Sequence, residues 1–372
     1  MNFAFTPEQE MLRDSVRSFL GDKAPSTRVR DLMETETGYD PELWAEMASM
    51  GLPAMHIPEA YGGAGFNSFE LGIVLEETGR ALTPSPLFGS VVLAANLLLI
   101  AGSEEQKAAH LPGIAAGDTT ATVAIAEQSG EWDVAGITAT AVPDGDEVVL
   151  NGVKSFVVDG HTAHTVFVAA KDPGGMLGFY AVDGHASGVV RRRLETMDMT
   201  RKQAEISLSD VRVAATSRLA AGDGATLSRL YDRAVTGLAF EQVGGAQMCM
   251  EMSVAYAKDR MQFGRPIGSF QAIKHKCADM LVVIESAKSA AYHAGWAADN
   301  DAEEFRVAAP LAKAYCSDAY FNVAGDTIQV HGGIGFTWEH DAHLYFKRAK
   351  SSQLMFGDSA EWRAVLAERL SI

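Results

Sequence analysis

Two pairs of histidines are the first residues in this chain whose type and spacing could do chemistry. His161 and His164 stand three residues apart, and so do His340 and His343, with a carboxylate on each side of His340. Two imidazoles at this spacing could reach one divalent metal ion, but such sites need three or four converging ligands. We therefore interpret both pairs as surface or helix-end histidines.

A second candidate is the segment His331-Gly332-Gly333, which is similar to part of the oxyanion-hole motif of lipases. The chain has no GxSxG nucleophile elbow and no triad downstream, which argues against hydrolase chemistry. It also has no P-loop, no GxGxxG that opens a βαβ unit and no HExxH zinc motif. Short general motifs therefore leave the chemistry unassigned.

Composition narrows the class of protein. The 372 residues include 31 basic and 48 acidic side chains, which give a formal charge of −17, with 47% apolar and 21% charged residues. These values are ordinary for a soluble globular protein, and the length suggests two or three domains. The acidic balance argues against a nucleic-acid partner, because such proteins concentrate positive charge.

The cysteines and the apolar segments bear on location. Cys249, Cys277 and Cys316 form no CxxC pair, which predicts neither disulfides nor a zinc knuckle and fits a reducing cytoplasm. The first 20 residues have early acidic side chains and no basic region before an apolar stretch, unlike a signal peptide. The longest apolar run, 91–101, is about half of the roughly 20 residues that a membrane span needs. We expect a buried helix there, no membrane partner and a cytoplasmic location.

The elements that must position these residues fall into three parts. Thr6, Pro7 and Gln9 form a capping-box pattern that predicts the start of a helical region. In the middle of the chain, short runs rich in β-branched and aromatic residues alternate with turn clusters, which predicts an antiparallel sheet or barrel. The helical period then returns. The predicted domains are a helical 1–118, a β domain 119–220 and a helical bundle 221–372.

Four segments follow one another along this framework. They are IPEAYGGAG at 57–65, RMQFGRPI at 260–267 followed by Phe270-Gln271, QVHGGIGF at 329–336, and the helical tail 341–350. Together they resemble the acyl-CoA dehydrogenase family over nearly the whole chain. One such motif would be weak evidence, whereas four in the right order across a helix–β–helix chain of family length are specific.

The resemblance implies a mainly α fold, with a helical N-terminal domain, a middle antiparallel β-barrel domain and a C-terminal four-helix bundle, in a dimer-of-dimers assembly. It implies FAD bound between two subunits and an acyl-CoA thioester stacked on the flavin. A base would remove a proton from the α-carbon while a hydride leaves the β-carbon for the flavin, giving a trans-2-enoyl-CoA. The base is needed because an α C–H beside a thioester is a poor acid. An electron-transfer flavoprotein would then take the electrons.

The resemblance also assigns residues to the cofactor. Arg260 matches an arginine that reaches a neighbouring subunit's FAD diphosphate, where a fixed cation forms strong charge-assisted bonds. Phe263 and Gln271 match further contacts to that neighbour's cofactor. Gln329 and the backbone at Gly332-Gly333 match the segment that contacts its adenosine and diphosphate end, where glycine permits close approach.

The catalytic positions depart from the family pattern. Counted without gaps from Gly333, the triplet that usually carries the catalytic glutamate falls on Met355-Phe356-Gly357, and Phe356 cannot take a proton. The alternative base position of some members, 29 residues before Phe263, is Ala234, which is also inert.

The flavin-holding segments of the β domain are altered as well. The chain reads AEQSGEWD at 126–133, where the family usually reads TEPxxGSD. The Trp-x-Thr that packs on the flavin and bonds to it becomes Phe156-Val157-Val158, and Val158 has no hydroxyl to donate. The chain thus keeps the residues that serve a neighbour's flavin and loses those that serve its own.

These losses predict a non-catalytic partner subunit in a heteromeric dehydrogenase, in which a second acyl-CoA dehydrogenase-like chain supplies the base and the flavin bed. The pattern resembles the α2β2 acyl-CoA dehydrogenases of actinobacterial steroid side-chain degradation. That resemblance suggests a bulky, steroid-like acyl group.

Two alternatives stay open. The chain could be a self-sufficient homotetramer with an unusual base, either Asp358 or Glu241, which lies about two helical turns beyond Ala234. Glu241 could equally be a helix-face carboxylate that bonds to backbone or to a partner subunit. Alternatively, the chain could be a flavin-free scaffold that binds a CoA ester, although Arg260 and Gln329 would then have no obvious task.

Overall fold

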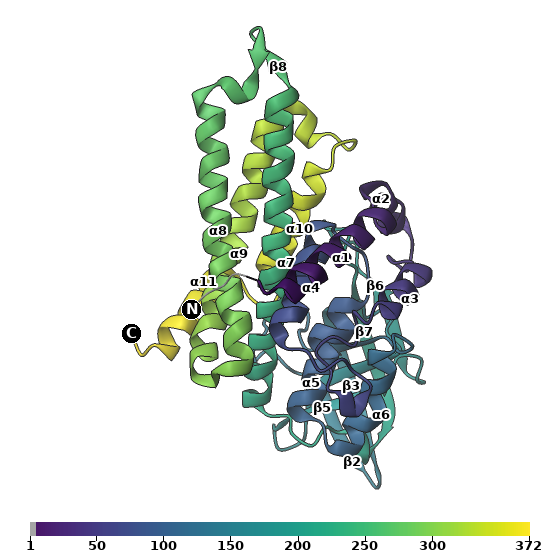
Figure 1. The fold of residues 1–372 in the computed structure, drawn as a ribbon. Helices are drawn as coiled ribbons and strands as arrows, with labels where there is room; N and C mark the ends of the chain where they lie inside the picture. Colours follow the sequence, from purple (N-terminus) through teal and green to yellow (C-terminus); the bar gives the residue numbers. More distant parts are fainter. Residues whose placement is uncertain (1–4) are drawn as a thin grey trace. The chain divides into compact units, whose positions relative to one another are not determined.

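The computed structural model describes residues 5–372 (Figure 1). Residues 1–4 of the sequence lie outside this range. The helices are α1 Pro7–Lys23, α2 Ser26–Glu34, α3 Pro41–Ser49, α4 Ser68–Arg80, α5 Asn96–Ala101, α6 Glu104–Ala115, α7 Gly224–Asp259, α8 Gln271–Asn300, α9 Ala302–His331, α10 Ala342–Leu354 and α11 Ser359–Arg369. The strands are β1 Ala121–Ala124, β2 Thr140–Asp144, β3 Glu147–Val158, β4 Thr165–Lys171, β5 Leu177–Asp183, β6 Val189–Arg193, β7 Gln203–Ala214, β8 Met261–Gln262 and β9 Arg265–Pro266. The predicted order of helices, sheet and helices is confirmed.

The chain folds into two compact units. The first comprises the described residues up to Arg30, Ser68–Thr83 and Val235–Ile372, and the second comprises Asp31–Asn67 and Pro84–Ala234. The N-terminal helices are therefore shared, because α1 and α4 belong to the unit of the C-terminal helices, whereas α3, α5 and α6 belong to the unit of the sheet.

The sheet of the second unit has seven strands in the order β1-β4-β2-β3-β7-β6, with β5 paired to β4. Its ladders are antiparallel except where β4 meets β1 and the first residue of β2 in parallel. Two of the β-rich runs in the middle of the sequence, 147–150 and 155–158, lie in the single long strand β3. Its register against β7 shifts between Lys154 and Val157, where Ser155 and Phe156 form a bulge.

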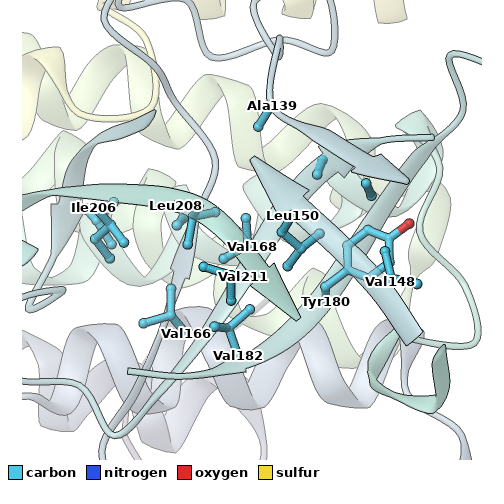
Figure 2. Packing of buried hydrophobic residues seen from close by; sticks show 14 of the residues in the cluster. Ala139, Val148, Leu150, Val166, Val168, Tyr180, Val182, Ile206, Leu208 and Val211 are labelled. Atoms are coloured by element: carbon cyan, nitrogen blue, oxygen red, sulfur yellow. The ribbon is translucent and has the colours of Figure 1, made fainter. Parts of the chain in front are cut away.

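The core of this unit lies on one face of the curled sheet (Figure 2). Alternate residues of β7 point inward, because successive side chains of a strand face opposite sides, and Ile206 and Leu208 meet Leu150 of β3 there. Val166 of β4 and Tyr180 of β5 close the same cluster.

The long apolar run is a buried helix, as predicted. Residues Phe88–Ala95 form a wide π-helical segment whose side chains are all buried, and α5 continues it. No helix within residues 5–372 combines the length and the apolar character that crossing a membrane would require.

In the first unit, α4 crosses α7 so closely that the backbones touch. A Cβ atom at Gly79 would lie 2.1 Å from the carbonyl oxygen of Glu241, and one at Gly244 would lie 1.8 Å from that of Glu76. A Cβ at Gly72 would lie 2.6 Å from the Phe240 ring. Only glycine, which has no Cβ, permits this approach.

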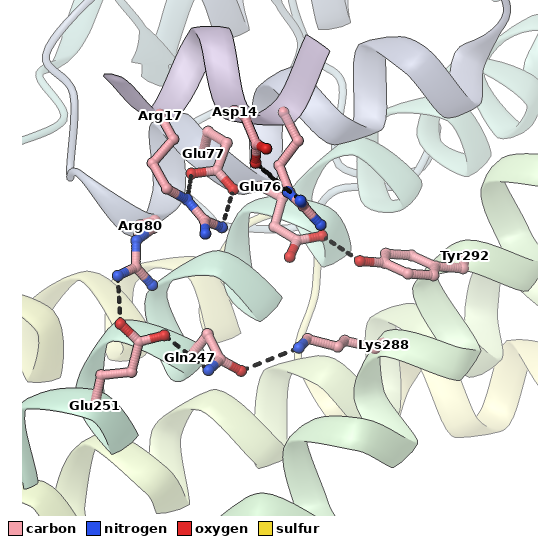
Figure 3. Close-up of polar contacts among 10 residues, drawn as sticks. Asp14, Arg17, Glu76, Glu77, Arg80, Gln247, Glu251, Lys288 and Tyr292 are labelled. Atoms are coloured by element: carbon pink, nitrogen blue, oxygen red, sulfur yellow. Dashed lines mark hydrogen bonds and ion pairs between the residues drawn. The ribbon is translucent and has the colours of Figure 1, made fainter. Parts of the chain in front are cut away.

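The same crossing gathers charged side chains from α1, α4, α7 and α8 (Figure 3). Arg17 donates two hydrogen bonds, of 2.8 and 2.6 Å, to the buried carboxylate of Glu77, and Arg80 pairs with Glu251. Charged hydrogen bonds of this kind are stronger than neutral ones, so they tie the N-terminal helices to α7.

Glu76 is the buried carboxyl group beside this network, and it accepts a 2.8 Å hydrogen bond from the Tyr292 hydroxyl (Figure 3). Burial raises the pKa of Glu76 from 4.5 to about 7, although the Tyr292 bond and the charge of Lys288 oppose the shift. The folded protein therefore holds this proton at pH values where the unfolded chain has lost it.

We expect the free energy of unfolding to fall as pH rises from about 4.5 to about 7, by the share that Glu76 contributes, because the unfolded chain releases this proton first. Glu76→Gln should remove that share, which amounts to roughly 1–3 kcal/mol. Tyr292→Phe should extend this pH range upward. The Tyr292 hydrogen bond lowers the pKa of Glu76, so its loss should raise that pKa. Urea unfolding across this range measures both, with exposed Glu303→Gln as control; equal pH slopes for wild type and Glu76→Gln would contradict the assignment.

Candidate functional site

A pocket of about 410 Å³ lies at the C-terminal end of α9, which is in the size range of small-molecule sites. Its lining residues are Gly325, Ile328, Gln329, Gly332, Gly333, Phe336 and Phe346. The helix ends at His331, and Gly332 turns the chain with a φ of +65° into the short 3₁₀-helix Gly332–Phe336. A Cβ at Gly332 or Gly333 would meet no atom within 4 Å, so the two glycines leave the backbone open to a ligand.

The pocket pairs aromatic rings with an exposed side-chain amide. The rings of Phe336 and Phe346 form apolar walls, and Phe346 stacks on Phe321 with centroids 5.1 Å apart. Gln329 is exposed and contributes donors and acceptors at the edge. Flat walls beside a few polar groups suit a planar heterocycle carrying polar substituents.

The hairpin of β8 and β9 joins α7 to α8 and ends in an exposed aromatic ring. Phe263 has a φ of +52° and is 91% exposed. Arg260 and Gln271, at the two ends of the hairpin segment, are also exposed, and the guanidinium of Arg265 lies 4.2 Å from the centroid of the Phe270 ring. A bare aromatic tip beside exposed cations is typical of a surface that another molecule covers.

The hairpin and the pocket lie at the same end of the helical bundle, because α7, α8 and α9 follow one another in alternating directions (Figure 1). The ring of Tyr256, near the end of α7, stacks on that of His331 with centroids 4.5 Å apart, which joins the two. The structure therefore brings the six residues predicted to serve a neighbour's cofactor to one end of one unit. They are Arg260, Phe263, Gln271, Gln329, Gly332 and Gly333.

The turn between α10 and α11 holds Phe356, which is 5% exposed and has a φ of +62°. Its carbonyl oxygen accepts a 2.8 Å hydrogen bond from the Trp362 indole. The carboxylate of Asp358 caps α11 by accepting from the N–H groups of Ala360 and Glu361, at 2.8 and 2.9 Å. Asp358 is thus already engaged as a helix cap.

Lys313 supports the same turn, and the sequence analysis did not identify it. Its ammonium group is fully buried and donates to the carbonyl oxygens of Ser352 and Gln353, at 2.7 and 3.0 Å, in the last turn of α10. Burial lowers the pKa of Lys313 to about 7. The sequence signal for this contact was a lysine among the apolar residues of α9, because a buried lysine must find hydrogen-bond acceptors.

Glu241, the alternative base, lies in a buried ion pair. Its carboxylate is 2.6 Å from the guanidinium of Arg348, and the two residues are 5% and 3% exposed. The Gly79 crossing packs directly on its backbone. This geometry supports the helix-face interpretation, since a base must be free to take a proton from the substrate.

Phe156 and Val158 lie in the sheet unit, on the bulged part of β3. Phe156 has a φ of +58° and is partly exposed, whereas the Val158 side chain is buried and its carbonyl oxygen accepts a 2.7 Å bond from the Thr122 hydroxyl. The Val158 side chain therefore offers no hydrogen bond to a flavin.

A buried ion pair that was not predicted from the sequence joins the segment 126–133 to strand β3, which carries Phe156 and Val158. The Lys154 ammonium is 2.8 Å from Glu127 and 2.9 Å from the Ile125 carbonyl oxygen, and Glu127 also accepts from Thr138 and Ala139. Burial lowers the pKa of Lys154 to about 8 against the attraction of Glu127. The scaffold under this surface is thus ordered although its flavin-bonding groups differ.

Family models match nearly the whole chain. They are the N-terminal, middle and C-terminal domains of acyl-CoA dehydrogenase, at residues 6–118, 122–211 and 226–371. The chain belongs to the acyl-CoA dehydrogenase family, whose members are FAD-dependent oxidoreductases.

Individual relatives agree with this assignment. Acyl-CoA dehydrogenase IpdE2 of Mycolicibacterium smegmatis is 36% identical over 360 residues, which span 95% of this chain and 96% of that protein. A variant of the Tcur3481-Tcur3483 steroid ACAD is 34% identical with a TM-score of 0.88, covering 98% of both chains. The ChsE4-ChsE5 complex from Mycobacterium tuberculosis is 27% identical with a TM-score of 0.91, covering 100% of this chain and 99% of that one.

The described residues fit one end of FAD better than the other. The aromatic pocket and its open glycine backbone suit a planar base, and the exposed Arg260 suits a diphosphate. The β3 surface lacks a donor at Val158, so it fits the flavin end less well.

We expect Glu241→Gln to lower stability without abolishing turnover, because the buried Arg348 keeps an acceptor but loses its counter-charge. The loss should be about 1–3 kcal/mol. Chemical unfolding and the rate of flavin reduction per folded holoprotein measure the two effects. Glu147→Gln, whose exposed pair with Arg212 contributes little, is the matched control. A flavin-reduction rate that collapses at unchanged stability would instead identify Glu241 as the base.

Proposed function

We propose that this chain is the subunit of a heteromeric acyl-CoA dehydrogenase that completes the FAD site of a catalytic partner chain. The observation that carries the proposal is the contrast between two positions. Phe356 occupies the expected base position as a buried side chain, while the residues expected to reach a neighbour's cofactor are exposed, in the pocket lining or on the β8–β9 hairpin segment.

The division of labour follows from the chemistry. When bound, FAD would supply the acceptor for the hydride of the substrate's β-carbon, and removal of the α-proton requires a carboxylate or another base. Phe356 offers none, Asp358 caps α11, and Glu241 is paired with Arg348. The partner chain therefore supplies the base.

The contribution of this chain is to bind and orient. Arg260 holds the diphosphate by a charge-assisted bond, and the pocket at Gln329 and Gly332-Gly333 holds the adenosine end. The exposed Phe263 ring becomes buried against the partner, which removes apolar surface from water. A cofactor fixed at its far end needs less reorganisation at its reactive end.

For the substrate we propose a CoA thioester with a bulky, steroid-derived acyl group, and for the electron acceptor an electron-transfer flavoprotein. The steroid ACAD likeness and the two-chain complexes among the similar structures support the acyl class and the heteromeric assembly.

We expect the chain expressed alone to hold almost no flavin, and the chain co-expressed with the acyl-CoA dehydrogenase-like gene nearest to it to hold about one FAD per pair of unlike chains. Absorbance of the released flavin against protein mass measures the ratio. One FAD per chain in an active homo-oligomer would support the self-sufficient alternative with Glu241 or Asp358 as base. A complex without any flavin would support the scaffold alternative.

Within that complex, Arg260→Ala should weaken FAD retention about tenfold to a hundredfold, because a charge-assisted bond is lost. Arg306→Ala, an exposed arginine near the start of α9 at the other end of the bundle, is the matched control. Equal FAD retention for the two variants would refute the role given to Arg260.

A further inference from the structure

His331 ends α9 next to the pocket, and its ring contacts α7 and the segment that precedes α10. It is 5% exposed and immediately precedes Gly332-Gly333. Its Nδ1 is 2.8 Å from the Thr327 carbonyl oxygen one turn earlier in α9, so Nδ1 carries the proton and donates it. One face of the ring stacks on Tyr256 of α7.

The His331 ring also meets a second imidazole. The centroids of the His331 and His340 rings are 4.3 Å apart, with the planes tilted by 53°. His340 Nδ1 accepts a 3.1 Å hydrogen bond from the Ala342 N–H at the start of α10, so this nitrogen carries no proton. His340 thereby fixes the segment that follows the 3₁₀-helix Gly332–Phe336.

The charged groups around this pair come from several elements. Arg30 lies 2.8 Å from Asp341 and donates to the Trp338 carbonyl oxygen. His343 stacks on Trp338, and the Lys347 ammonium lies 4.8 Å from the centroid of the same Trp338 ring. Burial lowers the pKa of His331, and the neighbouring His340 lowers it further. Burial also lowers the pKa of His340, as do Arg30 and His343, whereas the charge of Asp341 raises it.

We propose that His331 is a positioning residue for FAD, which holds the Gly332-Gly333 backbone in its binding geometry through its stack on Tyr256 and its tilted contact with His340. The inference rests on the proposed function, because it assumes that the pocket receives the adenosine end of the cofactor.

The geometry gives this role a specific pH dependence. A second proton on His331 would place a cation 4.3 Å from the His340 ring centroid, and a second proton on His340 would face the Ala342 N–H donor. A proton on His340 Nδ1 breaks its bond to Ala342, and a cation on His331 then repels a protonated His340, so the turn after α9 loosens. FAD affinity should therefore fall as pH decreases through the histidine range.

The test uses the holoprotein with its partner chain and follows FAD binding by flavin fluorescence from about pH 8 to about pH 5.5. His331→Leu removes the stack and the Thr327 bond and should weaken binding about tenfold to a hundredfold. His331→Phe keeps the stack and should rescue most of the affinity at high pH while flattening the pH profile. His340→Phe should flatten it as well. His293→Leu, an α8 histidine paired with Glu304, is the matched control.

The outcomes separate this inference from the function on which it rests. If both His331 variants bind FAD with the wild-type affinity and pH profile while Arg260→Ala still loses it, His331 has no positioning role and the proposed function stands. If Arg260→Ala also retains FAD, both fail. A His331→Phe variant that is as weak as His331→Leu at every pH would also overturn the inference, because the stack would then carry none of the effect.

Discussion

The close crossing of α4 and α7 is the constraint on which the first unit depends. Gly79 and Gly244 let the two backbones touch, and no side chain with a Cβ fits at either position. That contact fixes the height at which Glu76 and Glu77 face α1 and α8, and it leaves the Glu241 side chain directed at Arg348 of α10. Since α7 also carries Tyr256 near its far end, the helix that is anchored by glycines at one level contacts His331, beside the pocket, at another.

Two buried charged groups of this unit have strong partners. Glu241 meets Arg348, and Lys313 meets the carbonyl oxygens that end α10. A buried charge with an excellent partner gives little net stability but is costly to unpair. Groups of this kind therefore hold elements in register, and burial lowers the pKa of Lys313.

Much of the fold could be predicted from the sequence, because local signals and global structure agree. The capping box at Thr6 forms as expected, and the apolar run at 91–101 is buried in helix. The joining of two β runs into β3 could not be predicted, since the bulge at Phe156 depends on pairing with distant β7. Nor could the sharing of the N-terminal helices between units, which rests on contacts far apart in sequence. For the site, motifs pointed to the residues at the end of α9, whereas Lys154, Lys313 and the His331 stack depend on three-dimensional neighbours.

On the proposed function, Phe356 stands where a base is expected, and this changes what its turn needs from the rest of the protein. A catalytic carboxylate must stay solvated or be poised by neighbours, whereas a phenyl ring is stable when it is buried. The turn nevertheless keeps a left-handed residue, an indole bond to its carbonyl oxygen and a lysine on the preceding helix end. These contacts hold the turn as they would hold one that orients a functional group, although the side chain that it orients is apolar. On the proposed function, a partner subunit binds this surface and supplies the base. The turn then needs a fixed shape but no reactive group of its own.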